Sequence, residues 1–354
     1  MSNPSLRDVA AQAGVSAMTA SRVVRGLAVV KPATAERVRQ AITELGYRPD
    51  PLLSVLAGRR KRKGNSVVGA SVAVVTPGSD DKVWRDKPGF RSTVYGAVET
   101  ARSLGYGVEF ALGGDTVKSW ERVLGMLFAR GVRGLLIPPV QIVVPAGIDW
   151  SSFTGVNVGF GVRRTGFDTV RHDNYQMTTL ALEVLAQRGF QRIGVLLTQD
   201  EVRTQYRVGG ATMASGTWGA VKGKVVQTLM LDQPLMQLTD DSRWQFLEWV
   251  RTSRPEVVVS LYAHRLRNWL TGAGIRVPQD VGLVGLNIEA DRQNSRFAGV
   301  AIKPGQVGAA AAELLHSMIL RGQTGRPDAR QTLYLDGFWQ DGPSIRHSGS
   351  ADVC

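Results

Sequence analysis

The strongest constraint on the fold is the regular alternation of short β-branched runs with longer amphipathic segments after residue 64. The apolar runs are Val67–Val75, Val108–Leu112, Gly134–Ile137, Gly155–Val158, Ile193–Leu197, Val225–Leu231, Val257–Leu261 and Val281–Leu286. Helical periodicity lies between them at Phe90–Leu104, Ser119–Arg130, Tyr175–Arg188, Ser242–Ser253, His264–Gly274 and the alanine-rich Pro304–Arg321. Strands that alternate with helices of this length form βαβ units and mainly parallel sheets. An alternation that extends over about 290 residues predicts two α/β lobes.

The first part of the chain has a different pattern and carries most of the positive charge. Residues 1–63 show helical periodicity without strand-like runs, and they contain 12 Lys or Arg and 4 Asp or Glu. Their net charge of +8 compares with +5 for the remaining 291 residues of the 354. The basic, turn-rich stretch 59–66 is typical of a linker. Concentrated positive charge indicates contact with a polyanion, with a solvated basic tail as the alternative.

Several classes of protein are disfavoured by composition. No window offers the roughly 20 uninterrupted apolar residues that a membrane span needs, and the first residues lack a signal-peptide pattern. A single cysteine, Cys354, excludes an internal disulfide framework and a cysteine-based zinc site, and the four histidines lack metal-like spacing. We therefore expect a cytoplasmic protein without a membrane partner, metal or cofactor.

Three short helices are predicted within residues 5–46. Ser5 can cap the first helix, and Gly14-Val15-Ser16 forms a tight turn in which Ser16 caps a second helix, Ala17–Arg25. Pro32 stands at the first position of the third helix. Two helices joined by a short glycine-containing turn form a helix-turn-helix, whose second helix enters the major groove of DNA. The alternative is an ordinary three-helix bundle with charged faces.

The second helix presents the residues that would read DNA. Arg22 is the strongest base-reading candidate, because arginine can form a bidentate contact with guanine. Thr19 and Ser21 suit phosphate oxygens, and Ala17 and Met18 could pack against a thymine methyl. The full set of expected DNA-contacting residues is Ser5, Leu6, Ser16, Ala17, Met18, Thr19, Ser21, Arg22, Arg25, Tyr47, Leu53, Leu56 and Ala57.

The opening of the chain closely resembles the lac repressor (LacI/GalR) family. The resemblance rests on Leu6–Ala10, Ala13–Ser16, Thr19–Gly26, Glu36–Val38 and Leu45–Pro49, and it runs without a gap for nearly fifty residues. It implies a homodimer that binds pseudo-palindromic operator DNA and regulates transcription, with repression as the expected mode. It also implies an N-terminal helix-turn-helix domain at 1–48, and a hinge helix with a basic linker at 49–65.

The family's hinge helix enters the minor groove, and here two residues depart from its pattern. Asp50 replaces the usual asparagine and Leu53 the usual alanine, while Leu56 stands where the family places the leucine that wedges between base pairs. Such a wedge unstacks and kinks DNA. The acidic Asp50 is unfavourable near phosphate and the bulkier Leu53 alters how paired hinge helices would meet, while the leucine wedge at Leu56 is still expected.

Residues 66–342 resemble the family's periplasmic-binding-protein-like effector domain, in which two Rossmann-like lobes enclose a ligand cleft. The resemblance rests on 189–195, 276–285 and 337–339, and residues 343–354 are expected to form a flexible tail. Arg207 with Gly210 fits the family's R-x-x-G, although a surface arginine at a helix start is the alternative. The family's Asn-Asp pair is missing, and Leu261-Tyr262-Ala263-His264 stands in its place; the family's Asp is replaced by Asn287 and its Gln before proline by Lys303. These losses weaken the case for a common simple sugar.

The expected effector contacts come from this motif and from strand ends. They are Thr76, Phe160, Asp173, Arg207, Tyr262, Asn287 and Lys303, with Asp200 as a further strand-end candidate. Strand-end residues are more often part of the scaffold than of a ligand site. We expect the effector to be a small molecule, with a sugar or a related metabolite as one possibility.

Three rival functions are less well supported. An enzyme would need a catalytic motif, but Gly159-Phe160-Gly161 lacks the third glycine of a dinucleotide-binding loop, and no Walker, G-x-S-x-G or H-E-x-x-H motif occurs. A solute-binding protein would need export and would not carry a DNA-binding head. A nucleoid-type protein that binds DNA without an effector would not need a long two-lobed domain.

Overall fold

The computed structural model describes residues 6–24, 30–45, 70–140, 142–159, 165–234, 238–289 and 296–346. The chain separates into two compact units, residues 1–68 and 69–354. Each unit has its own apolar core and is described by itself.

The described part of the N-terminal unit contains the helices α1 Leu6–Gln12, α2 Ala17–Val24 and α3 Pro32–Leu45. Their small apolar residues form the core: Val9, Ala10, Ala13, Ala20, Val38 and Ala41 are all buried. The turn between α1 and α2 contains Gly14 at φ +61°, a conformation that glycine adopts without steric cost. The predicted helix-turn-helix is therefore present, with the turn at the expected glycine.

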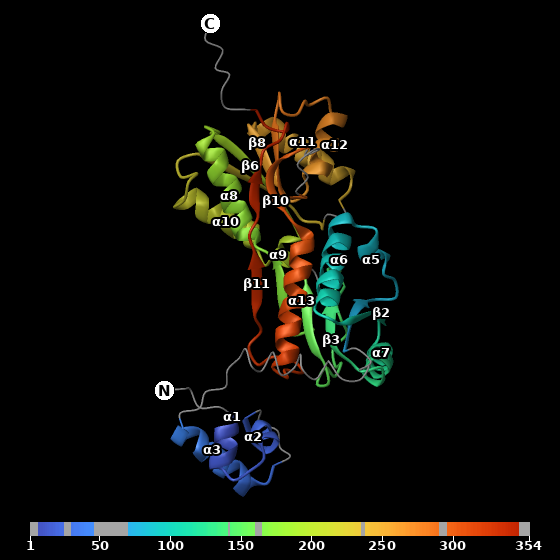
Figure 1. The fold of residues 1–354 in the computed structure, drawn as a ribbon. Coiled ribbons are helices and arrows are strands. Elements are labelled where there is room, and N and C mark those ends of the chain that lie inside the picture. Colours follow the sequence, from blue (N-terminus) through green and yellow to red (C-terminus); the bar gives the residue numbers. More distant parts are fainter. Residues whose placement is uncertain are drawn as a thin grey trace. The chain divides into compact units, whose positions relative to one another are not determined.

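The larger unit contains two six-stranded sheets, one in each lobe (Figure 1). The sheet of the first lobe has the order β11-β5-β4-β3-β1-β2, and every pairing in it is parallel. Its strands are β1 Ser71–Pro77, β2 Gly107–Gly114, β3 Val132–Ile137, β4 Thr154–Val158, β5 Asp168–His172 and β11 Thr332–Leu335. Its helices are α5 Lys82–Arg85, α6 Pro88–Ser103, α7 Val117–Ala129 and α13 Pro304–Leu320.

The sheet of the second lobe has the order β12-β10-β9-β8-β6-β7. Only the pairing of β10 with β12 is antiparallel among the described strands of this sheet. The strands are β6 Arg192–Thr198, β7 Val225–Leu231, β8 Val257–Ser260, β9 Gly282–Glu289, β10 Ala298–Ile302 and β12 Phe338–Gln340. The helices are α8 Asn174–Gln187, α9 Glu201–Thr204, α10 Arg207–Thr217, α11 Asp240–Ser253 and α12 Ala263–Gly272.

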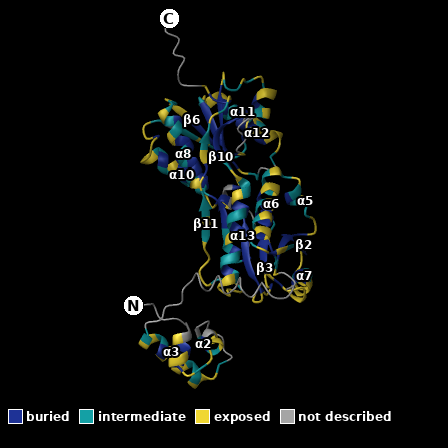
Figure 2. Ribbon diagram, in the orientation of Figure 1, coloured by how far each residue is buried: buried dark blue, intermediate teal, exposed yellow. Residues whose placement is uncertain are grey.

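Helices cover both faces of each sheet, as expected for parallel strands that are buried on both sides (Figure 2). In the first lobe α6 and α13 pack on one face, while α7 packs on the other through Trp120, Leu124 and Leu127. In the second lobe α8 and α10 bury against one face, and α11 and α12 against the opposite face. The two-lobed α/β architecture expected from the sequence is thus confirmed.

Helices α6 and α13 approach each other unusually closely, and glycines make this contact possible. A Cβ atom added at Gly308 would overlap the backbone of Thr93 and Ala97, and one added at Gly96 would overlap the backbone of Gly305. This close packing fixes α13 to the first lobe. Helix α13 begins just after a connection between the lobes.

The chain passes between the lobes three times. The connections run from β5 to α8 through Asp173, from β10 to α13 through Lys303, and from β11 to β12 through residues 336–337. The lobes are therefore discontinuous in sequence, and residues at these connections lie next to both of them.

Two expectations about secondary structure need correction. Strands β5, β10, β11 and β12 and helix α10 were not expected, because their sequences are polar, short or rich in glycine. The predicted flexible tail begins too early at residue 343. Ser344 and Ile345 are buried, since Ser344 accepts a hydrogen bond from the backbone N–H of Ala298 and the Ile345 side chain joins the core of the second lobe.

Candidate functional site

The surface expected to contact DNA is formed by helix α2. The side-chain oxygen of Ser16 accepts a hydrogen bond from the backbone N–H of Thr19 at 3.2 Å, so Ser16 caps the helix. Ala17, Met18 and Arg22 are exposed, whereas Ala20 is fully buried. Arg22 Nη2 lies 3.6 Å from Met18 Sδ, which places these two side chains side by side on the exposed face.

Several residues expected at DNA cannot be placed. Ser5, Arg25, Tyr47, Leu53, Leu56 and Ala57 lie outside the described residues. Leu6 and Ser21 belong to α1 and α2, but their side chains lie outside the described part as well. The hinge therefore remains a prediction from the sequence.

The larger unit contains a cavity of about 480 Å³ between the lobes. It lies at the carboxyl ends of strands from both sheets: Pro139, Gly159 and His172 stand at or after the ends of β3, β4 and β5, and Leu261 and Ile302 stand at those of β8 and β10. This is where open α/β sheets bind ligands, and the volume suits a small molecule.

Two of the expected effector residues line this cavity. Tyr262 and Asn287 are part of its wall. The hydroxyl of Tyr262 donates a hydrogen bond to a carboxylate oxygen of Asp200 at 2.9 Å, and Asp200 also lines the cavity. Thr198 packs beside them, with its hydroxyl 3.4 Å from the same carboxylate. These contacts hold the Tyr262 ring in place from the second lobe.

Asp173 and Arg207 form an ion pair next to the cavity. Arg207 donates to one carboxylate oxygen of Asp173 through Nη2 at 2.6 Å and Nε at 3.1 Å. The same oxygen caps α8 by accepting from the backbone N–H groups of Tyr175 and Gln176. Burial raises the pKa of Asp173, but these hydrogen bonds outweigh it and hold the pKa below its ordinary value. Asp173 and Arg207 are not among the described residues that line the cavity, although Asp173 lies between two that are.

Of the other residues expected to contact the effector, Thr76 and Lys303 have neighbours within the protein, and Phe160 lies outside the described residues. Thr76 accepts a hydrogen bond from Trp84 Nε1 at 2.9 Å, and both side chains are buried. Lys303 precedes α13, with its ammonium group 5.5 Å from the ring of Phe338. Phe160 lies outside the described residues.

His172 and Asn174, which sequence reasoning did not select, line the cavity on either side of Asp173. They are 7% and 2% exposed. Neither ring nitrogen of His172, nor Oδ1 of Asn174, meets hydrogen-bond geometry with any described residue. Burial lowers the pKa of His172 to about 4, and a weak hydrogen-bond contact with the backbone of Leu335 raises it by less, so the imidazole is neutral near pH 7. Buried polar groups without partners are rare and call for an explanation.

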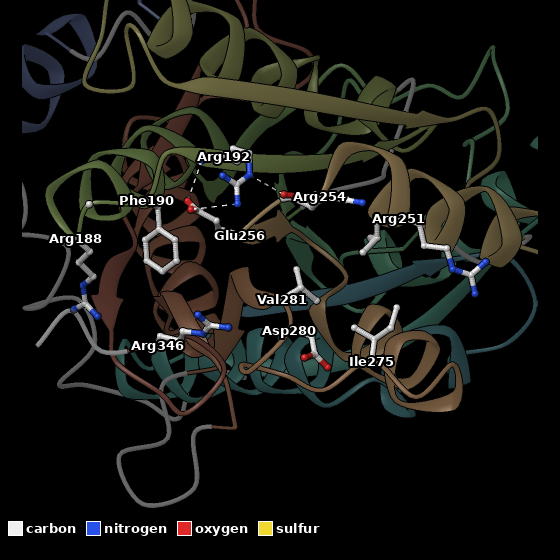
Figure 3. A pocket seen from close by; sticks show the side chains of 13 residues that line it. Arg188, Phe190, Arg192, Arg251, Arg254, Glu256, Ile275, Asp280, Val281 and Arg346 are labelled. Carbon is white, nitrogen blue, oxygen red and sulfur yellow. Dashed lines mark hydrogen bonds and ion pairs between the residues drawn. The ribbon is translucent and has the colours of Figure 1, made fainter. Parts of the chain in front are cut away.

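A second cavity, of about 550 Å³, lies at the opposite ends of the strands of the second lobe. It is rimmed by arginines, and Figure 3 shows that Arg192 and Glu256 point toward each other. Glu256 also accepts hydrogen bonds from the backbone N–H groups of Gln191 and Arg192 at 2.7 and 3.0 Å. Hydrogen bonds from Arg276 lower the pKa of Asp280 to about 2. Both carboxylates of this cavity are therefore engaged in bonds that brace the loops around it.

Comparison with known proteins agrees with these features. Residues 5–50 match the model for bacterial regulatory proteins of the lacI family, and residues 182–336 match the model for the periplasmic binding protein-like domain. The chain is 28% identical over 301 residues to the HTH-type transcriptional regulator CelR of Thermobifida fusca, covering 80% of this chain and 81% of that protein.

Two solved structures share the fold of the whole chain. One is a complex of the transcriptional regulator CelR with cellobiose, with a TM-score of 0.53 and 23% identity, covering 96% of this chain and 99% of that one. The other is the lac repressor dimer bound to operator and the anti-inducer ONPF, with a TM-score of 0.53 and 20% identity, covering 97% and 99%.

A helix-turn-helix head followed by a two-lobed domain of the periplasmic-binding type defines a class of DNA-binding transcriptional regulators. The chain belongs to the lacI family of bacterial regulatory proteins, as its N-terminal motif predicts.

Proposed function

We propose that the chain is a homodimeric repressor that binds a pseudo-palindromic operator and responds to a small molecule in the cavity between its lobes. The observation that carries this proposal is the combination of an exposed α2 face with an interlobe cavity at the strand ends. The protein would act in the cytoplasm and catalyse no reaction. None of the helices in the described ranges is both long and apolar enough to cross a membrane.

The head supports sequence-specific recognition. Arg22 is exposed on α2 beside Met18, and the buried alanines beneath them hold the helix against α1 and α3. An exposed arginine on such a helix can contact a guanine in the major groove, while the basic charge of the first 63 residues favours the phosphate backbone. Two heads in a dimer would contact two half-sites about one helical turn apart.

Dimerisation is supported by an apolar surface on the first lobe. Strand β2 is an edge strand of its sheet, and its Phe110 and Leu112 are exposed, as is Tyr95 on α6. The rings of Tyr95 and Phe110 lie 6.4 and 6.2 Å from the buried ring of Trp84. Exposed apolar groups beside an unpaired strand edge are features of protein–protein interfaces.

The response to ligand follows from the position of the cavity. Its wall combines residues of both lobes with His172 and Pro304, which flank two of the three connections. A ligand that binds one lobe arrangement better than another shifts the population toward that arrangement. The shift would reach the hinge and alter operator affinity. The relative whose structure was solved with cellobiose suggests a hydroxyl-bearing effector.

Selection of bound duplexes from a random library, using the purified full chain at moderate salt, tests the proposal. Enrichment of an inverted repeat is expected, because a twofold-symmetric dimer reads two related half-sites. Enrichment of a single, non-repeated site would contradict the dimer. Enrichment of no sequence, both with and without candidate metabolites, would contradict specific regulation.

A further inference from the structure

The second cavity, at the amino ends of the strands of the second lobe, has an excess of positive charge. Its described lining includes two carboxylates, Glu256 and Asp280, and five arginines: Arg188, Arg192, Arg251, Arg254 and Arg346. Both carboxylates already have partners, since Glu256 accepts from two backbone N–H groups and Asp280 accepts from the Arg276 side chain at 2.8 and 3.0 Å. The excess positive charge lies in a concave surface, where it attracts anions.

Two of the five arginines are accounted for without a ligand. Arg188 caps the C-terminal end of α8, and Arg251 lies in the last turn of α11. A positive charge is favoured at such helix ends by the helix dipole. Each also has an ion-pair partner outside the cavity lining, Asp341 for Arg188 and Glu248 for Arg251. The case for a ligand therefore depends on the other three arginines.

Arg192 and Arg346 do not lie at helix ends, and contacts with the backbone hold both at the rim of the cavity. Arg192 begins β6, and its Nε donates to the backbone oxygen of Arg254 at 2.9 Å. Arg346 donates to two backbone oxygens in the loop between α12 and β9. Both residues are exposed. Because a guanidinium group has five N–H donors, each retains donors for a ligand.

Arg254 occupies a backbone position that suits glycine better than arginine. It ends α11 at φ 45° and ψ 54°, in the left-handed region, where a Cβ atom is unfavourable and helices usually have glycine. Its side chain is exposed, and its guanidinium group has no hydrogen-bond or ion-pair partner among the residues that the structure describes. A strained residue whose side chain stabilises no described part of the protein indicates a role in binding.

The floor of the cavity is apolar. Val250, Pro255 and Val281 are buried, and Phe190 and Ile275 are half-buried beside them. In Figure 3 Arg192 and Arg346 lie on opposite sides of the cavity, with the ring of Phe190 at its edge. Arginines that surround an apolar floor, instead of converging on one point, suit a ligand with several anionic groups and an apolar body.

We propose that this cavity is a second ligand site, which binds an organic molecule of nucleotide size with at least two phosphate groups. Its phosphates would contact Arg192, Arg254 and Arg346, and its ring would cover Phe190. Guanidinium groups suit phosphates because they donate two parallel hydrogen bonds, and a volume of about 550 Å³ suits such a molecule. The inference goes beyond the proposed function, because binding here needs neither operator DNA nor a ligand between the lobes.

Four probes, orthophosphate, pyrophosphate, AMP and ADP, test the chemistry of the site. Each is titrated calorimetrically into the full chain at one ionic strength and without divalent cations. Pyrophosphate is expected to bind about tenfold more tightly than orthophosphate, since its second phosphate reaches a further arginine. ADP is expected to bind more tightly than either pyrophosphate or AMP, because it combines two phosphates with a ring that covers the apolar floor.

Arg254→Gly separates a binding role from a structural one. It is expected to weaken ADP binding about five- to tenfold through the lost charged contact. It should also raise the melting temperature of the unliganded protein by about 2 °C, because glycine adopts the left-handed conformation without strain. Arg346→Gln should weaken ADP binding to a similar extent, and thermal unfolding verifies that this variant is folded.

Two control variants remove the same charge outside the cavity. Arg37→Gln alters α3 of the basic N-terminal unit, and Arg321→Gln alters the C-terminal end of α13 in the first lobe. Both are expected to leave ADP affinity unchanged. An equal loss in Arg37→Gln and Arg254→Gly would assign binding to the overall charge of the chain and overturn the inference.

Three further results would overturn it: no binding of ADP, equal affinity for orthophosphate and pyrophosphate, or a loss of stability in Arg254→Gly. The last result would make Arg254 a structural residue. Failure of the proposed function would be seen separately, because selection of an operator does not depend on this cavity.

Discussion

Arg207 and Asp173, which are 34 residues apart, are joined by two hydrogen bonds to the same carboxylate oxygen, at 2.6 and 3.1 Å. The guanidinium carbon of Arg207 also lies 4.3 Å from the centre of the Tyr334 ring. Asp173 connects β5 to α8, Arg207 begins α10, and Tyr334 belongs to β11. The ion pair therefore ties together a connection between the lobes, a helix of the second lobe and a strand of the first.

Replacing Asp173 with asparagine tests the energy of this ion pair. Asparagine still caps a helix, so Asp173→Asn removes the charge interaction while retaining the cap. We expect a loss of about 1–2 kcal/mol in the free energy of unfolding, between the values for exposed and buried pairs. Asp173→Ala should lose about 1 kcal/mol more through the missing cap. Urea denaturation measures both, and Glu248→Gln in the exposed Arg251–Glu248 pair should change stability by less than about 0.5 kcal/mol.

The buried His172 predicts that acid destabilises the fold. Its pKa falls from 6.5 to about 4 on folding, so below pH 6.5 the unfolded chain binds a proton that the folded chain does not. Stability should therefore decrease as the pH is lowered from 6.5 to about 4, by roughly 2–3 kcal/mol from this group. His172→Gln should remove that part of the pH dependence, as measured by denaturation at several pH values. If the free energy of unfolding depends on pH in the same way in the wild type and in His172→Gln, the assignment is contradicted.

Two glycine-to-alanine substitutions in helices should have opposite effects. Gly308→Ala places a methyl group against the backbone of Thr93 where α13 meets α6, and we expect a loss of about 1–3 kcal/mol. In the described part of the chain, no neighbouring atom lies within 4 Å of a Cβ added at Gly125 on α7. Gly125→Ala should stabilise the protein by about 0.5–1 kcal/mol, because alanine is the better helix former. Thermal unfolding of the two variants decides whether close helix packing or helix propensity governs each site.

Arg22→Ala should weaken operator binding by about 1–3 kcal/mol and relax the preference at one base pair of each half-site. Binding to the selected operator and to single-base variants, measured by fluorescence anisotropy, gives both quantities. Arg39→Ala is the control on α3, where Arg39 pairs with Glu36 at 3.0 Å. An equal loss of affinity for every DNA sequence would make Arg22 a phosphate contact.

Phe110→Asp should shift the protein toward monomers, because it places a charge in the exposed apolar surface of β2 and α6. Sedimentation velocity measures the change, and affinity for a two-half-site operator should fall with it. Trp218→Asp is the control, since Trp218 is 79% exposed but belongs to the second lobe. An unchanged sedimentation coefficient for Phe110→Asp would contradict a dimer contact at this surface.

The fold could be predicted from the sequence wherever apolar residues follow a clear period. Helices α6, α7, α8, α11, α12 and α13 lie within two residues of their predicted bounds. Strand β5 was missed because Asp168, Arg171 and His172 interrupt its apolar pattern. Its neighbours provide partners that a local pattern does not show: Asp168, for example, accepts a hydrogen bond from the backbone N–H of Gln331 at 2.7 Å.

Part of the candidate site could also be predicted from the sequence, whereas the rest depends on how the helices and strands pack. Tyr262 and Asn287 were selected from strand ends and a family motif, and both line the cavity. Asp173 and Arg207 were also selected, but their pairing with each other depends on how α8 and α10 pack. Asn174 has the sequence pattern of an ordinary helix start. Only the fold reveals that its side chain is buried and that Oδ1 has no hydrogen-bond partner among the residues that the structure describes.

The three connections between the lobes limit what a bound molecule can communicate to DNA. Three covalent links prevent the lobes from separating, and they restrict sliding of one lobe past the other. We expect the motion that remains to be mainly a change in the angle between the lobes. Many chemically different molecules could therefore produce the same output, provided that each favours the same angle. Specificity for the molecule and sensitivity of the response would then be set by different residues, and evolution could alter either without the other.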